Sequence, residues 1–402
     1  MDSLRYSSIE ARSSRFWILL IGLALIALIG GLSAYHMEVE GHIITGMNNQ
    51  IVWGLPHVFA IFLIVAASGA LNAASIASVF GKVEYKPLAR LSALLALSLL
   101  AGGLAVLVLD LGRPDRLIVA MTVYNFKSIF AWNIFLYTGF FVIVGVYLWW
   151  MMDYPMMKYS KKAGLVAFIW RLILTTGTGS IFGFLVARSA YDSALLAPMF
   201  IIMSFAFGMA VYILVLLAAY SWTERPLGDY ILNKLRSLLG VFIASVLYFV
   251  AVYHLTNLYM TGQHAVEKFI LLDGGIYTNL FWIGQVLIGG LIPLALIYLP
   301  QFKNCRFTLG VACAMVIIGG FAQVYVLVVG GQAFPQEMFP GMEVSSSFFD
   351  GVVGEYYPSI WEMLLGLGGV AVSLVIVVVG ISVLQFLPDS LADNIIDPHY
   401  SK

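Results

Sequence analysis

Two acids and two arginines end an apolar stretch of this sequence, in the segment DLGRPDR at 110–116. The preceding residues 88–111 are almost entirely apolar, so Asp110 is expected at the boundary of a hydrocarbon region. An ionisable side chain at that depth is costly and indicates a functional site, with Arg113 and Arg116 as the nearest counter-charges. A glycine and a proline inside the segment end the helix there. A helix stop with solvated charges is the alternative interpretation.

The composition identifies an integral membrane protein. Hydrophobic residues make up 61% of the 402 residues and charged residues 10%, against about 45–50% and about 25% in soluble proteins. A membrane-spanning helix needs roughly 20 apolar residues, which predicts one all-α membrane domain over 1–402 with ten transmembrane helices. The predicted helices cover 16–35, 51–80, 88–111, 128–152, 164–187, 195–222, 238–260, 280–299, 309–330 and 360–386.

The distribution of lysine and arginine predicts the orientation, because these residues are enriched in cytoplasmic connections. Of the 21, 15 fall in the two terminal segments and every second connection, 5 fall on the other side, and Arg171 lies within the fifth span. Both termini are therefore expected on the cytoplasmic side of a bacterial or archaeal cytoplasmic (inner) membrane. The span 16–35 is expected to be a retained anchor, since its apolar run exceeds the roughly 7–15 residues of a signal peptide.

The second to fifth spans are expected to bring polar side chains together near the outer face. A histidine and a carboxylate at one small site can exchange protons near neutral pH, as a quinone requires when its oxygens gain or lose protons. Each of these residues alone more often forms a hydrogen bond between helices. The prediction of a quinone site therefore rests on the convergence of several such residues near one face. The residues are Trp53, His57, Asp110, Arg113, Asn133, Tyr137 and Arg188.

A second group of polar residues indicates a possible route for protons. Arg171 lies about 10 Å into the fifth span at about 1.5 Å per residue, where a long side chain can snorkel to the cytoplasmic surface. The alternative is a proton half-channel that continues along the same helix through Thr175 and Thr178. Glu362, near the start of the last span, is an interface acid that we assign to the same path.

The outer connection 331–359 is acidic and contains no lysine or arginine. We expect it to contact a partner protein, and a solvated loop is the alternative. Its acids are Glu337, Glu343, Asp350 and Glu355.

The sequence offers few ligands for a metal or a haem. Cys305 and Cys313 lack CxxC or CxxCH spacing, which argues against iron–sulfur clusters and covalent haem held by this chain. Only two histidines, His57 and His254, fall within predicted spans. They could ligate one b-type haem, but isolated intramembrane histidines more commonly form hydrogen bonds. We therefore expect no metal, haem or iron–sulfur cluster in this chain.

One region of the sequence carries a family resemblance. The residues DLGRP at 110–114 close a span, and the stretch 126–133, from Phe-Lys-Ser to Trp-Asn, opens the next. In these features the chain resembles the NrfD/PsrC-type membrane subunits, the cofactor-free quinone-interacting proteins of polysulfide reductase, nitrite reductase and alternative complex III. Its ten spans and the segment 49–72 are similar to the DsrP subgroup of sulfur-metabolising Dsr complexes. The resemblance covers nearly the whole chain.

The resemblance implies a fold of two four-helix bundles flanked by single helices. In family members the quinone lies in the first bundle, near the periplasmic face where an iron–sulfur subunit docks. His57 and Asp110 are accordingly expected to carry protons beside the quinone, and Arg113 to tune Asp110 or to contact the partner. The implied segments are the helix 16–35, the first bundle 51–187, the second bundle 195–330 and the helix 360–386.

We interpret the chain as the membrane quinone/quinol-binding subunit of a respiratory or sulfur-metabolism complex, without catalytic activity on its own. It is expected to bind exchangeable menaquinone or ubiquinone, and to exchange electrons with a periplasmic, ferredoxin-like iron–sulfur subunit. Other membrane and cytochrome subunits and the lipid bilayer are its further expected partners, and nucleic acid is not one. Proton translocation and the direction of electron flow stay open. Two alternative functions are a secondary transporter and a haem-b quinol oxidoreductase anchor. A transporter would gather polar residues around broken helices at the midplane.

Overall fold

The computed structural model describes residues 5–9, 13–302, 305–336 and 351–400. Within this part of the chain, ten helical segments are long and apolar enough to cross a membrane. This finding confirms the predicted all-α membrane fold with ten transmembrane helices.

The ten segments are built from one or more helical elements each. They are α1 (Ser14–Glu40); α2 (Leu55–Ala70) with α3 (Asn72–Ser78); η2 (Val83–Leu88) with α4 (Ala89–Leu109); α6 (Ile129–Met152); η4 (Met157–Tyr159) with α7 (Ser160–Gly183); α8 (Leu196–Trp222); α9 (Asp229–Tyr259); α11 (Ile276–Asn279), η7 (Leu280–Leu291) and α12 (Ile292–Tyr298); α13 (Arg306–Tyr325), η9 (Val326–Gly330) and α14 (Gly331–Ala333); and α15 (Ile360–Val383).

The remaining elements are short and lie between or beyond the spans. They are β1 (Tyr6–Ser7), η1 (His42–Ile44), η3 (Pro114–Arg116), α5 (Leu117–Thr122), η5 (Thr261–Gln263), α10 (His264–Lys268), η6 (Phe269–Asp273), η8 (Pro300–Phe302), β2 (Leu387–Pro388) and α16 (Asp393–Ile396).

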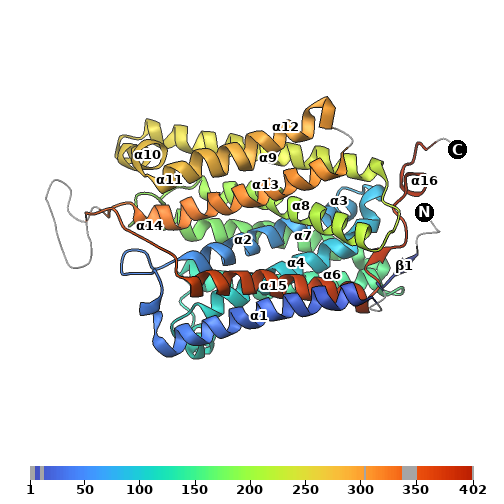
Figure 1. Cartoon of the computed structure of the whole chain (residues 1–402), viewed down its shortest axis with the longest axis horizontal. Coiled ribbons are helices and arrows are strands. Elements are labelled where there is room, and N and C mark those ends of the chain that lie inside the picture. Colours follow the sequence, from blue (N-terminus) through green and yellow to red (C-terminus); the bar gives the residue numbers. More distant parts are fainter. Residues whose placement is uncertain (1–4, 10–12, 303–304, 337–350, 401–402) are drawn as a thin grey trace.

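The long helices run side by side along the long axis of the molecule, and the two chain ends lie at the same end of it (Figure 1). Strand β1 pairs with β2 in an antiparallel register, which ties the N-terminal segment to the C-terminal one. We call this the terminal end, and the opposite end, where α10 and α14 lie, the distal end. The polar residues predicted to form a site belong to the distal end.

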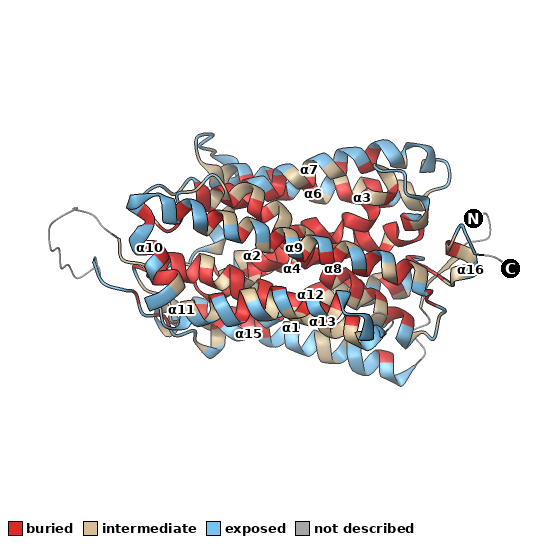
Figure 2. Ribbon diagram, turned by 90° about the horizontal axis from the view of Figure 1, so that it is seen from above, coloured by how far each residue is buried: buried red, intermediate tan, exposed pale blue. Residues whose placement is uncertain are grey.

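Apolar side chains cover the outward faces of the helices. On α1, for example, Ile18, Leu28 and Leu32 are each more than half exposed. Buried residues instead run along the inside of the helix assembly (Figure 2). A surface of exposed aliphatic residues on helices that satisfy their own backbone groups is what a lipid environment requires.

Helix α2 lies at the centre of the assembly and packs against α4, α8 and α15. Its approach to α8 depends on Gly69, because a Cβ there would overlap the carbonyl oxygen of Ser204. Small residues at such crossings let membrane helices come close enough for backbone contact. Because α2 contacts helices of both predicted bundles, we retain the division into 51–187 and 195–330 as a proposal, with the α2–α8 contact as its interface.

The second span is broken at Leu71, a feature that the sequence pattern did not predict. The hydroxyl of Ser92 on α4 donates to the carbonyl of Ala70 at 2.6 Å and accepts from the N–H of Ala74 at 3.1 Å. Backbone groups freed inside a membrane must find partners within the protein. Ser92 therefore stabilises the junction between α2 and α3.

Candidate functional site

A cavity of about 390 Å³ lies between α2, α4, α6 and α7, and we call it the distal cavity. Most of the residues that line it are apolar, including Ile61, Leu104 and Ile181. Ligand pockets typically have volumes of about 300–1,000 Å³, apolar walls and a few polar groups. Four of the residues predicted for the quinone site, and Thr178 of the predicted proton path, line it. The four are Trp53, His57, Asn133 and Tyr137.

His57 and Asp110 meet at the edge of the distal cavity. Nδ1 of His57 lies 2.7 Å from Oδ2 of Asp110, and the two side chains are 16% and 1% exposed, respectively. His57 lines the cavity, whereas Asp110 lies behind it. Neither Nδ1 nor either carboxylate oxygen has a well-aligned hydrogen bond among the described residues. The predicted pair is thus brought together, but only the histidine can touch a ligand in the cavity.

The start of α2 sets the position of His57. The sequence pattern predicted a helix from residue 51, but α2 begins at Leu55 because Gly54 adopts an extended conformation and Pro56 occupies the first turn. The N–H of Leu55 donates to the hydroxyl of Tyr356 at 2.6 Å. A Cβ at position 54 would lie 2.5 Å from Oε1 of Glu362 and 2.7 Å from the hydroxyl of Tyr356, so a larger residue there would displace both side chains. His57 therefore lies in the first turn of the helix rather than two turns in.

Trp53 forms an aromatic wall beside His57. Its ring stacks on that of His57, with centroids 6.1 Å apart and an interplanar angle of 27°, and on that of Tyr191 at 6.5 Å. The ring of Phe182 meets it edge-on at 5.8 Å. Stacked and edge-to-face rings fix one another's orientation. The neighbouring rings thus hold the indole of Trp53 in one orientation on the wall of the cavity.

Arg188 supports this wall from outside the cavity. Its guanidinium donates to the backbone carbonyls of Gln50 at 2.8 Å and Gln332 at 3.1 Å. The side chain of Gln332 accepts from the N–H groups of Val52 and Trp53 and donates to the carbonyl of Trp53 at 2.9 Å. Arg188 does not line the cavity, so the prediction that it binds the quinone is not supported. Its hydrogen bonds instead hold the segment before α2 in place.

Asn133 presents an unpaired polar atom at the cavity. Its Nδ2 donates to the carbonyls of Ile129 at 2.9 Å and Gly177 at 3.3 Å. Its Oδ1 is buried and has no hydrogen-bond partner among the described residues. A buried polar atom without a partner is costly. Oδ1 is therefore available to accept a hydrogen bond from a ligand or water.

The distal cavity is open towards the lipid-facing side of the molecule. Three of its lining residues, Met121, Phe130 and Thr138, are exposed on the surface formed by α5 and α6. A hydrophobic ligand dissolved in the membrane can therefore reach the interior without passing through water.

Arg113 does not approach Asp110. Its guanidinium forms two hydrogen bonds with Asp115, at 3.0 and 2.9 Å, and both side chains are about 60% exposed. The hydrogen bond from Arg113 lowers the pKa of Asp115 below its usual value. Arg113 also does not line the distal cavity. The expectation that it binds the quinone or tunes Asp110 is therefore not supported, because the nearer carboxylate of Asp115 competes for it.

Arg171 is buried, so the expectation that it snorkels to the membrane surface is wrong. Its Nη1 donates to the carbonyl of Ser68 at 2.9 Å and to Oδ1 of Asn72 at 2.7 Å, on either side of the break in the second span. Its guanidinium lies 5.1 Å from the ring centroids of Phe168 and Phe205. Arg171 thus ties α7 to the junction between α2 and α3.

The other residues of the predicted proton path occupy different surroundings. Thr175 donates to the carbonyl of Arg171 and contacts Oγ of Ser68, each at 2.7 Å. Thr178 bonds the carbonyl of Leu174 in its own helix and lines the distal cavity. Arg171 and Thr175 do not line that cavity, so the helix carries polar groups at two levels.

Glu362 belongs to a structural network at the distal end. It caps α15 by accepting from the N–H of Ser359 at 2.7 Å, and it also accepts from the N–H of Gly46 at 2.8 Å and the hydroxyl of Tyr356 at 2.6 Å. These bonds connect α15 to the segment before α2, away from Arg171. The grouping of Glu362 with Arg171 in one path is therefore not supported.

Three supporting residues were missed by the sequence analysis: Gln50, Gln332 and Tyr356. Each is nearly fully buried and bonds the backbone of a segment distant in sequence. No local pattern identifies such contacts, although an amide inside an apolar run, as at Gln332, signals that a partner is needed.

The structure does not bring His57 and His254 to one cavity, as a shared haem would require. His57 lines the distal cavity, whereas His254 lines another and contacts Glu267. Within the described residues there is no group of three or more histidines, cysteines and acids that could hold a metal. Of the acids in the connection 331–359, Glu337, Glu343 and Asp350 lie outside the described residues.

The fold and the site together define a class: a polytopic membrane protein with a lipid-accessible cavity and a buried histidine–carboxylate pair. The family described as "Polysulphide reductase, NrfD" matches residues 44–336. This match covers most of the chain, and the protein belongs to that family.

Similarity over most or all of the chain extends to subunits of several oxidoreductases. The chain is 28% identical over 404 residues to the Hdr-like menaquinol oxidoreductase integral membrane subunit of Archaeoglobus fulgidus, covering 98% of this chain and 100% of the relative. It is 24% identical to a selenate reductase subunit of Mesobacillus selenatarsenatis, covering 88% and 90%. It is 25% identical to a polysulfide reductase chain of Wolinella succinogenes, covering 71% and 96%.

Proposed function

We propose that this protein is the membrane quinol-oxidising subunit of a multi-subunit oxidoreductase, with the quinol bound in the distal cavity. The observation that carries the proposal is the placement of His57, backed by Asp110, on the wall of an apolar cavity that opens to lipid. A relative named as a menaquinol oxidoreductase subunit aligns over nearly the whole chain, which favours menaquinol over ubiquinol as the substrate.

The residues of the cavity can take part in quinol oxidation as follows. Oxidation of a quinol to a quinone releases two electrons and two protons. His57 has Nδ1 turned towards Asp110, so its Nε2 is the atom that can take a hydroxyl proton from the quinol. Asp110 stabilises the imidazolium that results and can accept the proton from Nδ1. Asn133 Oδ1 can accept a hydrogen bond from the other hydroxyl, whose proton follows through His57 and Asp110 once the first proton has passed from Asp110 to solvent at the distal end.

The electrons must leave to another subunit, because the chain holds no predicted redox centre. We assign this role to a periplasmic, ferredoxin-like iron–sulfur subunit that docks at the distal end. The corresponding orientation has both termini in the cytoplasm, in line with the distribution of basic residues. Two relatives are named as individual components of selenate and polysulfide reductases, which supports membership of a larger complex.

The assignment to the DsrP subgroup stays a prediction. The relatives reported above are named for menaquinol, selenate and polysulfide chemistry. The terminal substrate of the complex would follow from its partner subunits rather than from this chain.

The test uses the chain in lipid nanodiscs and in its complex. Quinone binding should quench the fluorescence of Trp53, and Trp53→Phe should remove that part of the quenching. His57→Ala should abolish electron transfer from menaquinol to the partner while the complex still assembles. If the His57→Ala complex oxidises menaquinol like the parent, the proposed site is wrong.

A further inference from the structure

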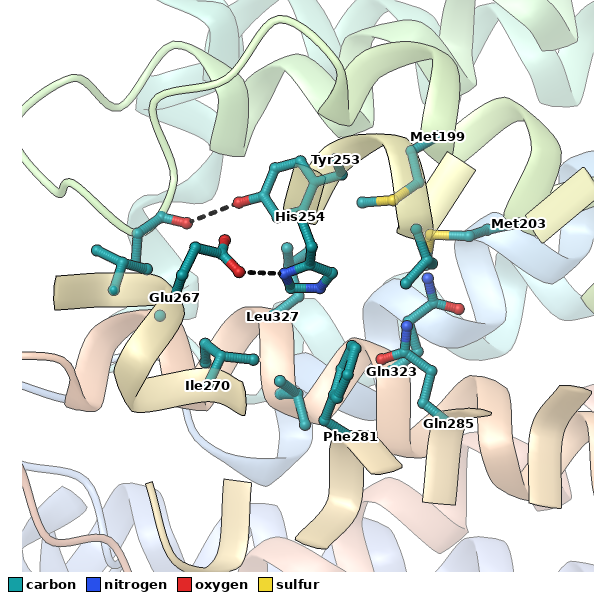
Figure 3. Close-up of a pocket in the computed structure, with 15 residues that line it drawn as sticks. Met199, Met203, Tyr253, His254, Glu267, Ile270, Phe281, Gln285, Gln323 and Leu327 are labelled. Carbon is teal, nitrogen blue, oxygen red and sulfur yellow. Dashed lines mark hydrogen bonds and ion pairs between the residues drawn. The ribbon is translucent and has the colours of Figure 1, made fainter. Parts of the chain in front are cut away.

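A second buried histidine–carboxylate pair lies between α9 and α10. Nδ1 of His254 is 2.6 Å from Oε2 of Glu267, and the side chains are 14% and 1% exposed. Asn257 donates to the other carboxylate oxygen at 2.8 Å. Figure 3 shows His254 between Glu267 on one side and Gln285 and Gln323 on the other.

A cavity of about 50 Å³, which we call the second cavity, is lined by His254, Glu267 and the two glutamines. A water molecule needs only about 10–15 Å³ measured in this way, whereas ligand pockets typically exceed about 300 Å³. The second cavity can therefore hold a few water molecules but no quinone. Gln323 is 5% exposed, and its Nε2 has no partner among the described residues. An unpaired buried amide on the wall of a cavity indicates bound water.

A smaller cavity of about 10 Å³ continues from the second one towards the middle of the membrane. The two share Val250, Gln285 and Gln323, and the smaller one reaches Ile243 on α9. From His254 to Ile243 the helix rises about 16 Å at about 1.5 Å per residue, roughly half of a hydrocarbon core of about 30 Å. Within the described part of the chain, the only polar side chains on its wall are Gln285 and Gln323, so the polar groups extend from the distal end as far as these two glutamines, and apolar side chains line the rest.

We propose that the second cavity is a hydrated proton-binding site, with His254 and Glu267 as the titrating pair. A proton delivered by water to Nε2 of His254 leaves Nδ1 free to pass its own proton to Glu267, and the reverse steps return it. No electron moves and no bond to a heavy atom changes. The site would hold protons independently of whether quinol binds in the distal cavity.

Among the described residues, no lysine or arginine lines the second cavity to compensate the charge of Glu267. Lys268, the next residue along the chain, is paired with Asp273 at 2.9 Å in an exposed position. The hydroxyl of Tyr253 is already bonded to the carbonyl of Ala190. The faces that α8, η7 and α13 turn to the pair contribute methionines, Phe281, and the two glutamines. His254 is therefore the titratable side chain in contact with Glu267, beside the amide of Asn257.

Hydration can be measured on the unmodified chain in lipid nanodiscs by radical footprinting with mass spectrometry. Met203 and Met209 both lie on α8 and are both 0% exposed, but only Met203 lines the second cavity. Bound water next to Met203 should make its oxidation by X-ray-generated hydroxyl radicals several-fold faster than that of Met209. Equal rates would show that the cavity is dry and would overturn the proposal.

Protonation can be followed by infrared difference spectroscopy between two pH values. The parent should show a carboxyl band that Glu267→Gln removes and that Asp273→Asn, an acid outside the cavity, retains. A spectrum that Glu267→Gln leaves unchanged would show that this pair does not titrate. Neither result depends on menaquinol oxidation, so failure of the proposed quinol site and failure of this inference can be told apart.

Discussion

The imidazole of His57 separates Asp110 from the distal cavity, with its Nδ1 2.7 Å from the carboxylate. The carboxylate is 1% exposed, so a ligand in the cavity meets the ring and not the acid. In such an arrangement the carboxylate fixes the orientation of the ring and stabilises its protonated form. We propose that Asp110 is a positioning residue for His57.

Asp110→Asn should slow quinol oxidation, because the amide cannot stabilise the imidazolium or accept its proton. General acid–base catalysis contributes about 10²–10⁴-fold, and we expect loss of the carboxylate behind the base His57 to lower the turnover of menaquinol by the complex about 10²-fold. Asp115→Asn, which removes an exposed acid five residues away, is the matched control. Equal turnover in the two variants would show that the DLGRPDR segment only ends the helix and has no role in quinol oxidation.

The membrane fold and the main residues of the site could be predicted from the sequence. Apolar runs of about 20 residues predict the membrane-spanning helices. A histidine and an acid at matching depths, His57 and Asp110, predict the contact between the two side chains. The partner of Arg113 could not be predicted, since two acids lie within three residues of it and only the turn decides between them. The burial of Arg171 was also missed, because Asn72 inside an apolar run signals that a partner is needed but does not show which helix supplies it.

Thr138→Trp should obstruct the mouth of the distal cavity. Thr138 is an exposed lining residue on α6 whose hydroxyl bonds the carbonyl of Ile134 in its own helix. An indole at this position would occupy part of the entrance, and we expect the Kd for a menaquinone analogue to rise about tenfold. Quenching of tryptophan fluorescence on titration with the quinone measures this effect.

Thr176 on α7 provides the control for that substitution. It too is exposed and bonds its own helix, at the carbonyl of Leu172, but it does not line the cavity. Thr176→Trp should therefore leave the Kd unchanged. A similar loss of affinity in both variants would mean that the quinone does not enter beside Thr138.

Arg188→Leu should loosen the segment that carries Trp53. The substitution leaves the carbonyls of Gln50 and Gln332 without their charged donor, and hydrogen bonds to charged groups contribute about 2 kcal/mol. We expect a lower thermal midpoint in nanodiscs and weaker quenching of Trp53 by quinone. Arg113→Leu removes an exposed arginine from the same end and should change neither the thermal midpoint nor the quenching. A lower thermal midpoint in the Arg113→Leu variant would contradict this expectation.

Arg171→Met tests whether Arg171 stabilises the broken span or conducts protons. The methionine leaves the buried Oδ1 of Asn72 without its donor, and the carbonyl of Ser68 with only the N–H of Leu71. An unsatisfied buried acceptor costs about 1–3 kcal/mol, so the free energy of unfolding in mild detergent should fall measurably. Combining it with Asn72→Leu removes one unpaired acceptor, and the double variant should recover part of that loss. A normal unfolding midpoint for Arg171→Met, together with slower quinol-driven proton release, would instead assign Arg171 to a proton path.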